Sequence, residues 1–200
     1  MSSDKRGIGL LGGTFDPVHN GHIAICRSYL DSGYIDKLYV VLTPNPPHKT
    51  DRELTDFNHR LNMLNLALND LSNLWVSAIE DKLSRPSYTV NTVMYFRNEF
   101  PDEQLYLCIG EDSFNHFTEW YHWEEIIENC TLLVARRPNT DDSNLPEKLK
   151  NNARFIGHEE IGISSSEIRD RLSDGEDVAQ ELPEEVMNYI NDHHLYQTAT

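Results

Sequence analysis

The sequence has few basic side chains and no long apolar run. Lys and Arg number 17 against 33 Asp and Glu, so the formal net charge of the 200 residues is −16. Binding to nucleic acid or to an anionic membrane needs a basic face, and this charge argues against both partners. The longest apolar runs, residues 38–42 and 132–135, fall far short of the roughly 20 residues that cross a bilayer.

Cysteine is also scarce. Cys26, Cys108 and Cys130 are odd in number and widely spaced, and they form no Cys-x-x-Cys metal pair. This usage suits a reducing compartment. Only a short apolar stretch follows the first six residues, which is not the pattern of a secretory signal. The sequence therefore predicts a cytoplasmic protein.

The composition is that of a folded chain. Hydrophobic residues make up 38% and aromatic residues 10%, too much for a disordered protein. A length of 200 residues without visible repeats predicts one domain over residues 1–200, in which residues 163–200 form a C-terminal helical part.

Apolar runs that read as strands alternate with segments of helical periodicity. Strands are expected at residues 8–11, 38–42, 75–79, 105–109, 131–135 and 154–156. Helices are expected at residues 21–30, 57–69, 89–100, 165–172 and 184–192, with a short helix ending at 126–127. The polar residues 139–152 are expected to form a surface insertion.

This alternation predicts an α/β fold with a mostly parallel sheet. Ligands bind such sheets at the carboxyl ends of the strands, near the point where the strand order reverses. The loops in which to look for chemistry are therefore residues 12–22, 43–49, 110–123 and 136–138.

Residues 7–12 fit the Gly-x-Gly-x-x-Gly spacing of a dinucleotide-binding fingerprint. That fingerprint needs a strand before the glycines and a helix that opens within them. Only six residues precede Gly7, and Leu10 and Leu11 stand where the helix should begin. A strand through residues 8–11 fits better, which leaves a dehydrogenase as the weaker alternative.

The loop at residues 12–22 combines two glycines with two histidines. Gly12 and Gly13 would let the backbone approach a bulky anion closely. His19 and His22 stand at the expected start of a helix, where unpaired N–H groups and the helix dipole favour phosphate. No Walker lysine follows the glycines, so this is no P-loop. The histidines could instead be a metal pair, although only Asp16 is nearby as a further ligand, or two ordinary polar residues.

The motif His19-Asn20-Gly21-His22 resembles the HxGH signature of the nucleotidyltransferase superfamily, and residues 163–169 resemble its second signature, Ile-Ser-Ser ending in Ile-Arg. The chain as a whole is similar to nicotinate-nucleotide adenylyltransferases nearly end to end. The segments that carry this similarity are residues 45–49, 85–89, 109–114, 120–123, 136–138 and 186–196. The departures are the polar insertion and Asn139, where members often have Gly.

The resemblance implies a Rossmann-like nucleotidyltransferase fold and a reaction of NAD biosynthesis. The adenylyl group of ATP would pass to nicotinate mononucleotide, giving nicotinic acid adenine dinucleotide and pyrophosphate. Mg²⁺ would be the cofactor, held mainly by the ATP phosphates and water, so no metal-ligating residues are expected. The partners would be these two small molecules, and a homo-oligomer is compatible with the sequence.

The resemblance also implies roles for individual residues. The catalytic residues would be His19, His22 and Arg169. ATP would be bound by Gly12, Gly13, Thr14, Phe15, His19, His22, Ser165 and Arg169. The mononucleotide would be bound by Asn45, His48, Lys49, Ser87, Tyr88, Thr89, Asp112, Trp120 and Tyr121. In this scheme Trp120 stacks on the pyridine ring, while Thr89 and the Tyr121 N–H hold the carboxylate.

Structural roles are the alternatives for several of these residues. Thr89 and Asp112 could be helix N-caps, and residues 164–169 could form a plain capped surface helix. Trp123, Tyr88 and Phe117 are expected mainly to pack. Two other functions stay open: adenylyl transfer to another acceptor, and a noncatalytic nucleotide-binding module. The other acceptor would be nicotinamide mononucleotide or pantetheine phosphate, and residues 86–89 and 120–121 argue against pantetheine phosphate. We expect a locally positive site on an acidic surface.

Overall fold

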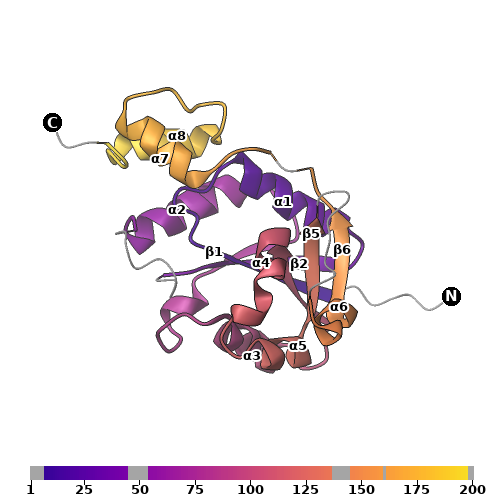
Figure 1. Cartoon of the computed structure of the whole chain (residues 1–200). Coiled ribbons are helices and arrows are strands. Elements are labelled where there is room, and N and C mark those ends of the chain that lie inside the picture. Colours follow the sequence, from indigo (N-terminus) through magenta and orange to yellow (C-terminus); the bar gives the residue numbers. More distant parts are fainter. Residues whose placement is uncertain (1–6, 45–53, 137–144, 160, 198–200) are drawn as a thin grey trace.

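The computed structural model describes residues 7–44, 54–136, 145–159 and 161–197. A six-stranded sheet in the order β3-β2-β1-β4-β5-β6 forms the centre, and every neighbouring pair of strands is parallel (Figure 1). The strands are β1 (Gly7–Gly13), β2 (Ile35–Leu42), β3 (Leu74–Ser77), β4 (Leu105–Gly110), β5 (Thr131–Arg136) and β6 (Ala153–Gly157).

Helices cover both faces of the sheet (Figure 1). One face carries α1 (Asn20–Asp31), α2 (Phe57–Leu68), α7 (Ser165–Ser173) and α8 (Glu184–Asp192). The other carries α3 (Thr89–Glu99), α4 (Glu111–Asn115), α5 (Trp123–Asn129) and α6 (Glu147–Asn152). The predicted α/β fold with a parallel sheet and a helical C-terminal part is confirmed. Within the described ranges, no helix has both the length and the apolar composition to cross a bilayer.

The glycine pattern at residues 7–12 lies inside β1, and no helix opens within it. A Cβ at Gly9 would lie 2.6 Å from Ile35 Cδ1 and 3.0 Å from Cys108 Sγ. Glycine is therefore needed there for close packing between strands and not for a pyrophosphate. The dinucleotide-fingerprint interpretation fails on geometry.

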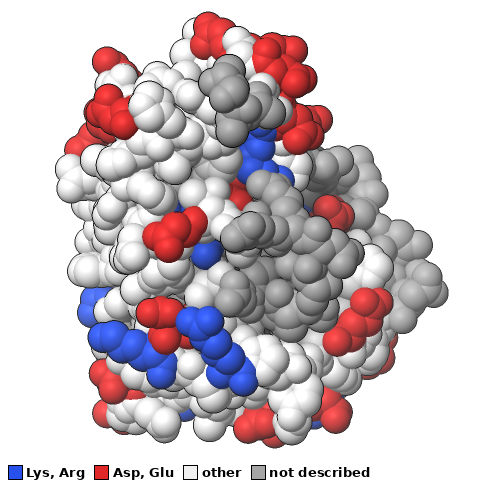
Figure 2. All heavy atoms as spheres, turned by 90° about the vertical axis from the view of Figure 1, so that its left-hand side faces the viewer, with Lys and Arg blue, Asp and Glu red and all other residues white. Residues whose placement is uncertain are grey.

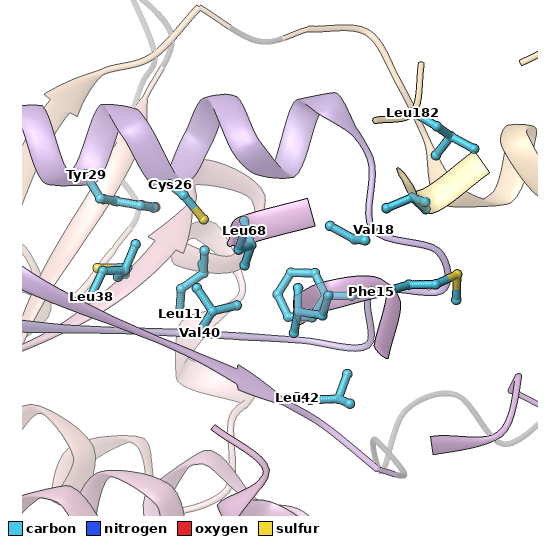
Figure 3. Packing of buried hydrophobic residues seen from close by; sticks show 14 of the residues in the cluster. Leu11, Phe15, Val18, Cys26, Tyr29, Leu38, Val40, Leu42, Leu68 and Leu182 are labelled. Atoms are coloured by element: carbon cyan, nitrogen blue, oxygen red, sulfur yellow. The ribbon is translucent and has the colours of Figure 1, made fainter. Parts of the chain in front are cut away.

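Two apolar clusters fill the spaces on either side of the sheet. Figure 3 shows part of the first cluster, where Leu11, Val18, Cys26 and Tyr29 fill the space between α1 and the strands. Residues of α7 and α8, such as Ile168 and Ile190, belong to the same cluster. The C-terminal helices thus share the core of α1 and α2. The single domain over residues 1–200 stays a prediction.

Two expectations about secondary structure are wrong. The strand predicted at residues 75–79 ends at Ser77, and a 3-10 turn, η1 (Ile79–Asp81), follows it. The Ser77 hydroxyl accepts the Ile79 N–H at 3.3 Å, so a local turn takes a donor that a strand would use.

The second error is the surface insertion, whose residues 139–144 lie outside the described ranges. Residues 147–152 form α6, and its Leu149 is fully buried. The Asn152 side chain donates to the carbonyls of Ile127 and Cys130 and accepts the Leu132 N–H. The polar composition hides these contacts, because only Leu149 and the partly buried Leu145 anchor the described part of the segment.

Candidate active site

A cavity of about 370 Å³ opens at the carboxyl ends of the central strands. Strand β1 pairs with β2 on one side and with β4 on the other, so the strand order reverses there. This is the place where open parallel sheets bind ligands. The cavity is lined by Leu10, Leu11, Gly12, Gly13, Thr14, Val41, Thr43, Glu80, Ser87, Tyr88, Thr89, Thr92, Leu107, Cys108, Ile109, Gly110, Ser113, Trp120 and Tyr121.

The two histidines of the HxGH motif form one unit at the start of α1. His19 is the N-cap, and its N–H donates to His22 Nδ1 at 3.2 Å. The two ring centroids are 3.8 Å apart. Because Nδ1 of His22 accepts this bond, the proton of the neutral ring lies on Nε2. In a neutral His22 ring, Nε2 is therefore the nitrogen that can act as a donor.

Gly21 allows this arrangement. A Cβ at position 21 would lie 3.0 Å from both Cε1 and Nδ1 of His19, tighter than ordinary contact. A side chain there would press on the His19 ring. The glycine of the motif is therefore needed so that the His19 ring can keep its position.

His19 is buried, with 6% of its surface exposed. Burial lowers its pKa to about 4, so the imidazole is neutral at pH 7. Among the described residues its Nδ1 has no hydrogen-bond partner. A buried polar atom left unpaired is costly, and a ligand oxygen that reaches it would relieve that cost.

The glycines before the histidines differ in what they permit. A Cβ at Gly13 would lie 2.8 Å from Cζ of Phe15, whose ring is buried in the core under the loop (Figure 3). Gly13 is thus required by packing. The buried Phe15 ring leaves only the backbone of this residue open to a ligand, and the expected ATP contact of the loop stays a prediction. At Gly12 a Cβ would meet nothing within 4 Å, so this glycine faces the open cavity.

The second signature docks on this loop, although about 150 residues separate the two in sequence. Ser165 Oγ donates to the Pro17 carbonyl at 3.0 Å, and Arg169 Nη1 donates to the Asp16 carbonyl at 2.6 Å. Ser164 caps α7 by accepting the N–H groups of Ser166 and Glu167, as the alternative of a plain capped helix predicts. That alternative does not explain why Ser165 and Arg169 turn towards the histidine loop.

The Asp16 side chain supports the loop from within. It is buried, accepts the Tyr196 hydroxyl at 2.7 Å, and accepts the Thr55 N–H at 3.5 Å. A carboxylate held in this way belongs to the loop's internal support. The cis Asp16–Pro17 peptide lies in the same segment.

Arg60 of α2 is a second support, which the sequence analysis missed. It is 1% exposed and donates to four backbone carbonyls, those of Thr14, Thr43, Pro44 and Thr55. Burial lowers its pKa, and the nearby Asp16 carboxylate opposes that shift. The sequence did carry a signal: positions 57, 60, 64 and 68 share one helix face, and Arg60 is the charged residue among apolar ones.

Aromatic side chains form one wall of the cavity. Trp120 is half-buried, lines the cavity, and lies 5.0 Å from the Phe117 ring. Tyr121 stacks on Tyr88 with 4.3 Å between ring centroids. Phe117 is buried and Trp123 packs against the core, as expected. Among the described residues, the two tyrosines and Trp120 are the aromatic side chains that a flat ring in this cavity could meet.

The alternative roles of Thr89 and Asp112 as helix N-caps do not hold. Tyr88 is the N-cap of α3, and Thr89 is its first residue and lines the cavity. Gly110 is the N-cap of α4, whose second residue, Asp112, is exposed. Asp112 does not line the cavity; the neighbouring Ser113 does.

Glu80 is a further cavity residue that the sequence analysis missed, and no periodicity marks it. It is 5% exposed, and Thr92 Oγ1 donates to its Oε1 at 2.6 Å. Burial raises the pKa of this carboxyl, against the opposing effects of the Thr92 and Thr43 hydroxyls. Within the described part of the chain, Glu80 is the charged residue that lines the cavity. The expectation of a locally positive site is therefore wrong for the cavity itself.

The structure thus brings together most of the predicted site. Gly12, Gly13, Thr14, Ser87, Tyr88, Thr89, Trp120 and Tyr121 line the cavity. His19, His22, Ser165 and Arg169 belong to the adjoining loop and to the helix docked on it. Asn45, His48 and Lys49 lie outside the described residues.

Comparison with known proteins agrees with this geometry. A family model described as cytidylyltransferase-like matches residues 10–171. A probable nicotinate-nucleotide adenylyltransferase of Chlorobium phaeobacteroides is 37% identical over 197 residues, covering 95% of this chain and 98% of that protein. One of Pseudomonas fluorescens is 34% identical over 209 residues, covering 95% and 97%.

Solved structures show the same fold. The Plasmodium falciparum nicotinic acid mononucleotide adenylyltransferase complexed with NaAD has a TM-score of 0.74 at 21% identity, with 96% of this chain and 97% of that chain covered. From these matches over nearly its whole length, the chain belongs to the cytidylyltransferase-like family, among the nicotinate-nucleotide adenylyltransferases.

Proposed function

We propose that this chain transfers the adenylyl group of ATP to nicotinate mononucleotide, forming nicotinic acid adenine dinucleotide and pyrophosphate in NAD biosynthesis. The observation that carries the proposal is the junction of the HxGH loop with Ser165 and Arg169, beside a cavity walled by Trp120. The junction suits polyphosphate and the cavity suits a flat ring. The acceptor, nicotinate mononucleotide, is inferred from the name of the relatives.

In the proposed reaction, a phosphate oxygen of the mononucleotide attacks the α-phosphorus of ATP. One P–O bond forms, the bond from the α-phosphorus to the bridging oxygen breaks, and pyrophosphate leaves with the bonding electrons. The nucleophile is already an anion, so no general base is required. Catalysis then consists of placing two polyanions in line and neutralising the developing charge.

In this proposal, the HxGH loop and α7 bind the phosphates of ATP. His22 Nε2–H would donate to the α-phosphate, and the neutral His19 would offer a second ring nitrogen. The first turn of α1 adds backbone N–H groups and a positive dipole end. Arg169 can grip the leaving β- and γ-phosphates in a bidentate manner, with Ser165 beside it.

In this proposal, the cavity binds the mononucleotide. Trp120 would stack on the pyridine ring, and Thr89 with the Tyr121 N–H would hold its carboxylate at the first turn of α3. Ser87 and Tyr88 would complete this side, whereas Asp112 is exposed and lies outside the cavity lining. Asn45, His48 and Lys49 would meet the mononucleotide phosphate.

Mg²⁺ fits this site as an ion that arrives with ATP. In the described part of the chain, no group of three or more His, Cys, Asp and Glu side chains is placed to hold a metal ion. The lack of such a group among these residues also argues against the interpretation of the two histidines as a metal-binding pair. When bound, Mg²⁺ would neutralise phosphate charge, with phosphate oxygens and water as its ligands. A cytoplasmic location belongs to the proposal, and the three buried free thiols support it.

Pyrophosphate release tests the proposal. The chain is mixed with ATP and Mg²⁺ and, in parallel, with nicotinate mononucleotide or nicotinamide mononucleotide. Fast release with the acid and little with the amide is expected. Equal release would keep the chemistry but reject the carboxylate contacts of Thr89 and Tyr121. No release with either would favour a noncatalytic nucleotide-binding module.

A further inference from the structure

Glu80 has a position that the proposed mechanism does not use. It lies on η1, directly after strand β3, and its side chain lines the cavity. Its Oε1 accepts the Thr92 hydroxyl, and the Thr43 hydroxyl lies close enough to lower the pKa of the carboxyl. Its Oε2 is buried and makes no hydrogen bond of normal geometry among the described residues. One carboxylate oxygen is thus held by the protein, and the other remains for whatever enters the cavity.

A buried carboxylate without a counter-charge is costly. Within the described ranges no Lys, Arg or His lines the cavity, and the rest of its lining is apolar or neutral. Desolvation penalises the charge of Glu80, which is why burial raises its pKa. A ligand that carries positive charge into the cavity would relieve this penalty, whereas a purely anionic ligand would increase it.

We propose that Glu80 is the counter-charge for the cationic ring nitrogen of the bound mononucleotide, and that it selects pyridinium nucleotides against those with an uncharged ring. This inference rests on the proposed function. A glycosylated pyridine nitrogen carries a positive charge, and reduction of the ring to the dihydropyridine removes that charge without changing the substituents. The acceptor class is therefore the oxidised, quaternary pyridine nucleotide.

The carboxylate of nicotinate does not conflict with Glu80, because the ring has two poles. The acidic pole is served by neutral donors at Thr89, the first residue of the 11-residue α3, where the helix dipole favours an anion. The cationic pole would face the carboxylate of Glu80, which lies in the 3-10 turn η1 after β3. Stacking on Trp120 holds the plane of the ring, and an aromatic face also attracts a cation. The cavity is thus arranged for a zwitterionic ring.

The test compares the binding of two ligands to the wild-type chain and to Glu80→Gln. The ligands are nicotinate mononucleotide and its dihydropyridine form, and dissociation constants are measured by calorimetry. Gln keeps the shape and the acceptor for Thr92 but removes the charge. The wild-type chain should prefer the oxidised form by about tenfold or more, as expected for a neighbouring opposite charge. The variant should bind the oxidised form about tenfold more weakly and the reduced form unchanged.

Two further variants control the comparison. Glu119→Gln removes the same charge from an exposed position on η2 (Phe117–Glu119), paired with His116, and should leave both dissociation constants unchanged. Glu80→Asp keeps the charge and should keep the preference for the oxidised ring. The melting temperature of each variant shows whether it is folded, and the preference of the wild-type chain can be measured without any variant.

Several outcomes would overturn the inference. If Glu80→Gln weakens both ligands equally, the residue has only a structural role. If the wild-type chain binds both forms alike, or the variant keeps the preference, Glu80 is not the counter-charge, although the proposed function stands. If the wild-type chain binds neither form and releases no pyrophosphate, the proposed function fails and the inference falls with it.

Discussion

At the scale of single residues, the two histidines of the HxGH loop have different tasks. His22 is oriented by the backbone of His19 and presents an Nε2 donor. His19 is buried and neutral, with a ring nitrogen that the described protein leaves unpaired. In the proposed function, phosphate recognition would depend on oriented hydrogen-bond donors, and the formal positive charge would come from Arg169 and from the ion that accompanies ATP.

Replacing His22 by Ala should lower kcat/KM about 10²- to 10³-fold, because it removes one preorganised donor from the transition state. The His19 N–H loses its acceptor, which should cost about 1–3 kcal/mol of unfolding free energy. Steady-state kinetics and thermal unfolding measure the two effects. The matched control is His116→Ala, an exposed histidine, which should change neither. Near-normal turnover of the His22 variant would remove it from the mechanism.

Gly21→Ala should separate activity from stability. Ala is favoured over Gly inside a helix by roughly 1 kcal/mol, but its Cβ would lie 3.0 Å from the His19 ring. A small shift of that ring should lower kcat/KM by about 10- to 100-fold. The control is Gly157→Ala, where a Cβ meets nothing within 4 Å. Full activity in Gly21→Ala would mean that the position of the His19 ring does not matter.

The lowered pKa of His19 predicts a dependence of stability on pH. The folded imidazole has a pKa of about 4 and the unfolded one about 6.5, so the unfolded chain binds more protons below pH 6.5. Stability is therefore present above pH 6.5 and lost as the pH falls towards 4, by about 2 kcal/mol between pH 7 and pH 5.

His19→Asn isolates this contribution, because Asn caps helices well and does not titrate. Glu80 and His158 also have shifted pKa values, but they are common to both proteins and cancel in the difference. The stability advantage of the wild-type chain over His19→Asn, measured by urea unfolding, should shrink by about 2 kcal/mol from pH 7 to pH 5. A constant difference would show that His19 is not buried as described.

The spacing of residues predicted one part of the site and missed another. His19, His22, Ser165 and Arg169 belong to short motifs whose residue types suit phosphate. Glu80 was missed because it follows a strand in a 3-10 turn, where no periodicity indicates which side chains point inward. Its function depends on a tertiary contact with Thr92 of α3, which the sequence does not show.

At the scale of elements, α2 holds together the two loops that follow β1 and β2. The side chain of Arg60 donates to carbonyls of both loops, at 2.8–3.0 Å. Arg60→Met should therefore destabilise the fold by about 3–5 kcal/mol, because four acceptors and the Asp16 charge lose their buried partner. Urea unfolding measures the loss.

The control for this prediction is Arg85→Met. Arg85 is exposed and pairs with Asp81 four residues earlier, a contact worth less than about 1 kcal/mol. A loss as small in Arg60→Met as in the control would contradict the proposed support of the loops by α2.

Elements with strong periodicity were predicted almost to the residue. The helix expected at residues 184–192 is α8 over the same residues, and the one expected at 57–69 is α2, ending at Leu68. Short elements were missed: α4 has five residues, and α6 buries a single leucine. Neither is long enough to show a repeating apolar face, and their place is decided by tertiary packing.

At the scale of the whole molecule, the net charge of −16 opposes anionic substrates. On the face shown in Figure 2, acidic side chains gather at the upper end, over the C-terminal helices, while basic and acidic groups mix lower down. The proposed binding of two polyanions would therefore depend on local donors, namely the start of α1, the two histidines and Arg169. The parallel sheet places these donors at one edge, next to the cavity between β1 and β4.

The central claim is that the α-phosphorus of ATP, and not the γ-phosphorus, is transferred to a pyridine mononucleotide. ATP labelled with ³²P at the α-position and, separately, at the γ-position tests it most directly, with nicotinate mononucleotide and Mg²⁺ present. The α-label should appear in a dinucleotide and the γ-label in pyrophosphate. An acceptor that carries the γ-label, or an α-label that stays in ATP, would contradict the account.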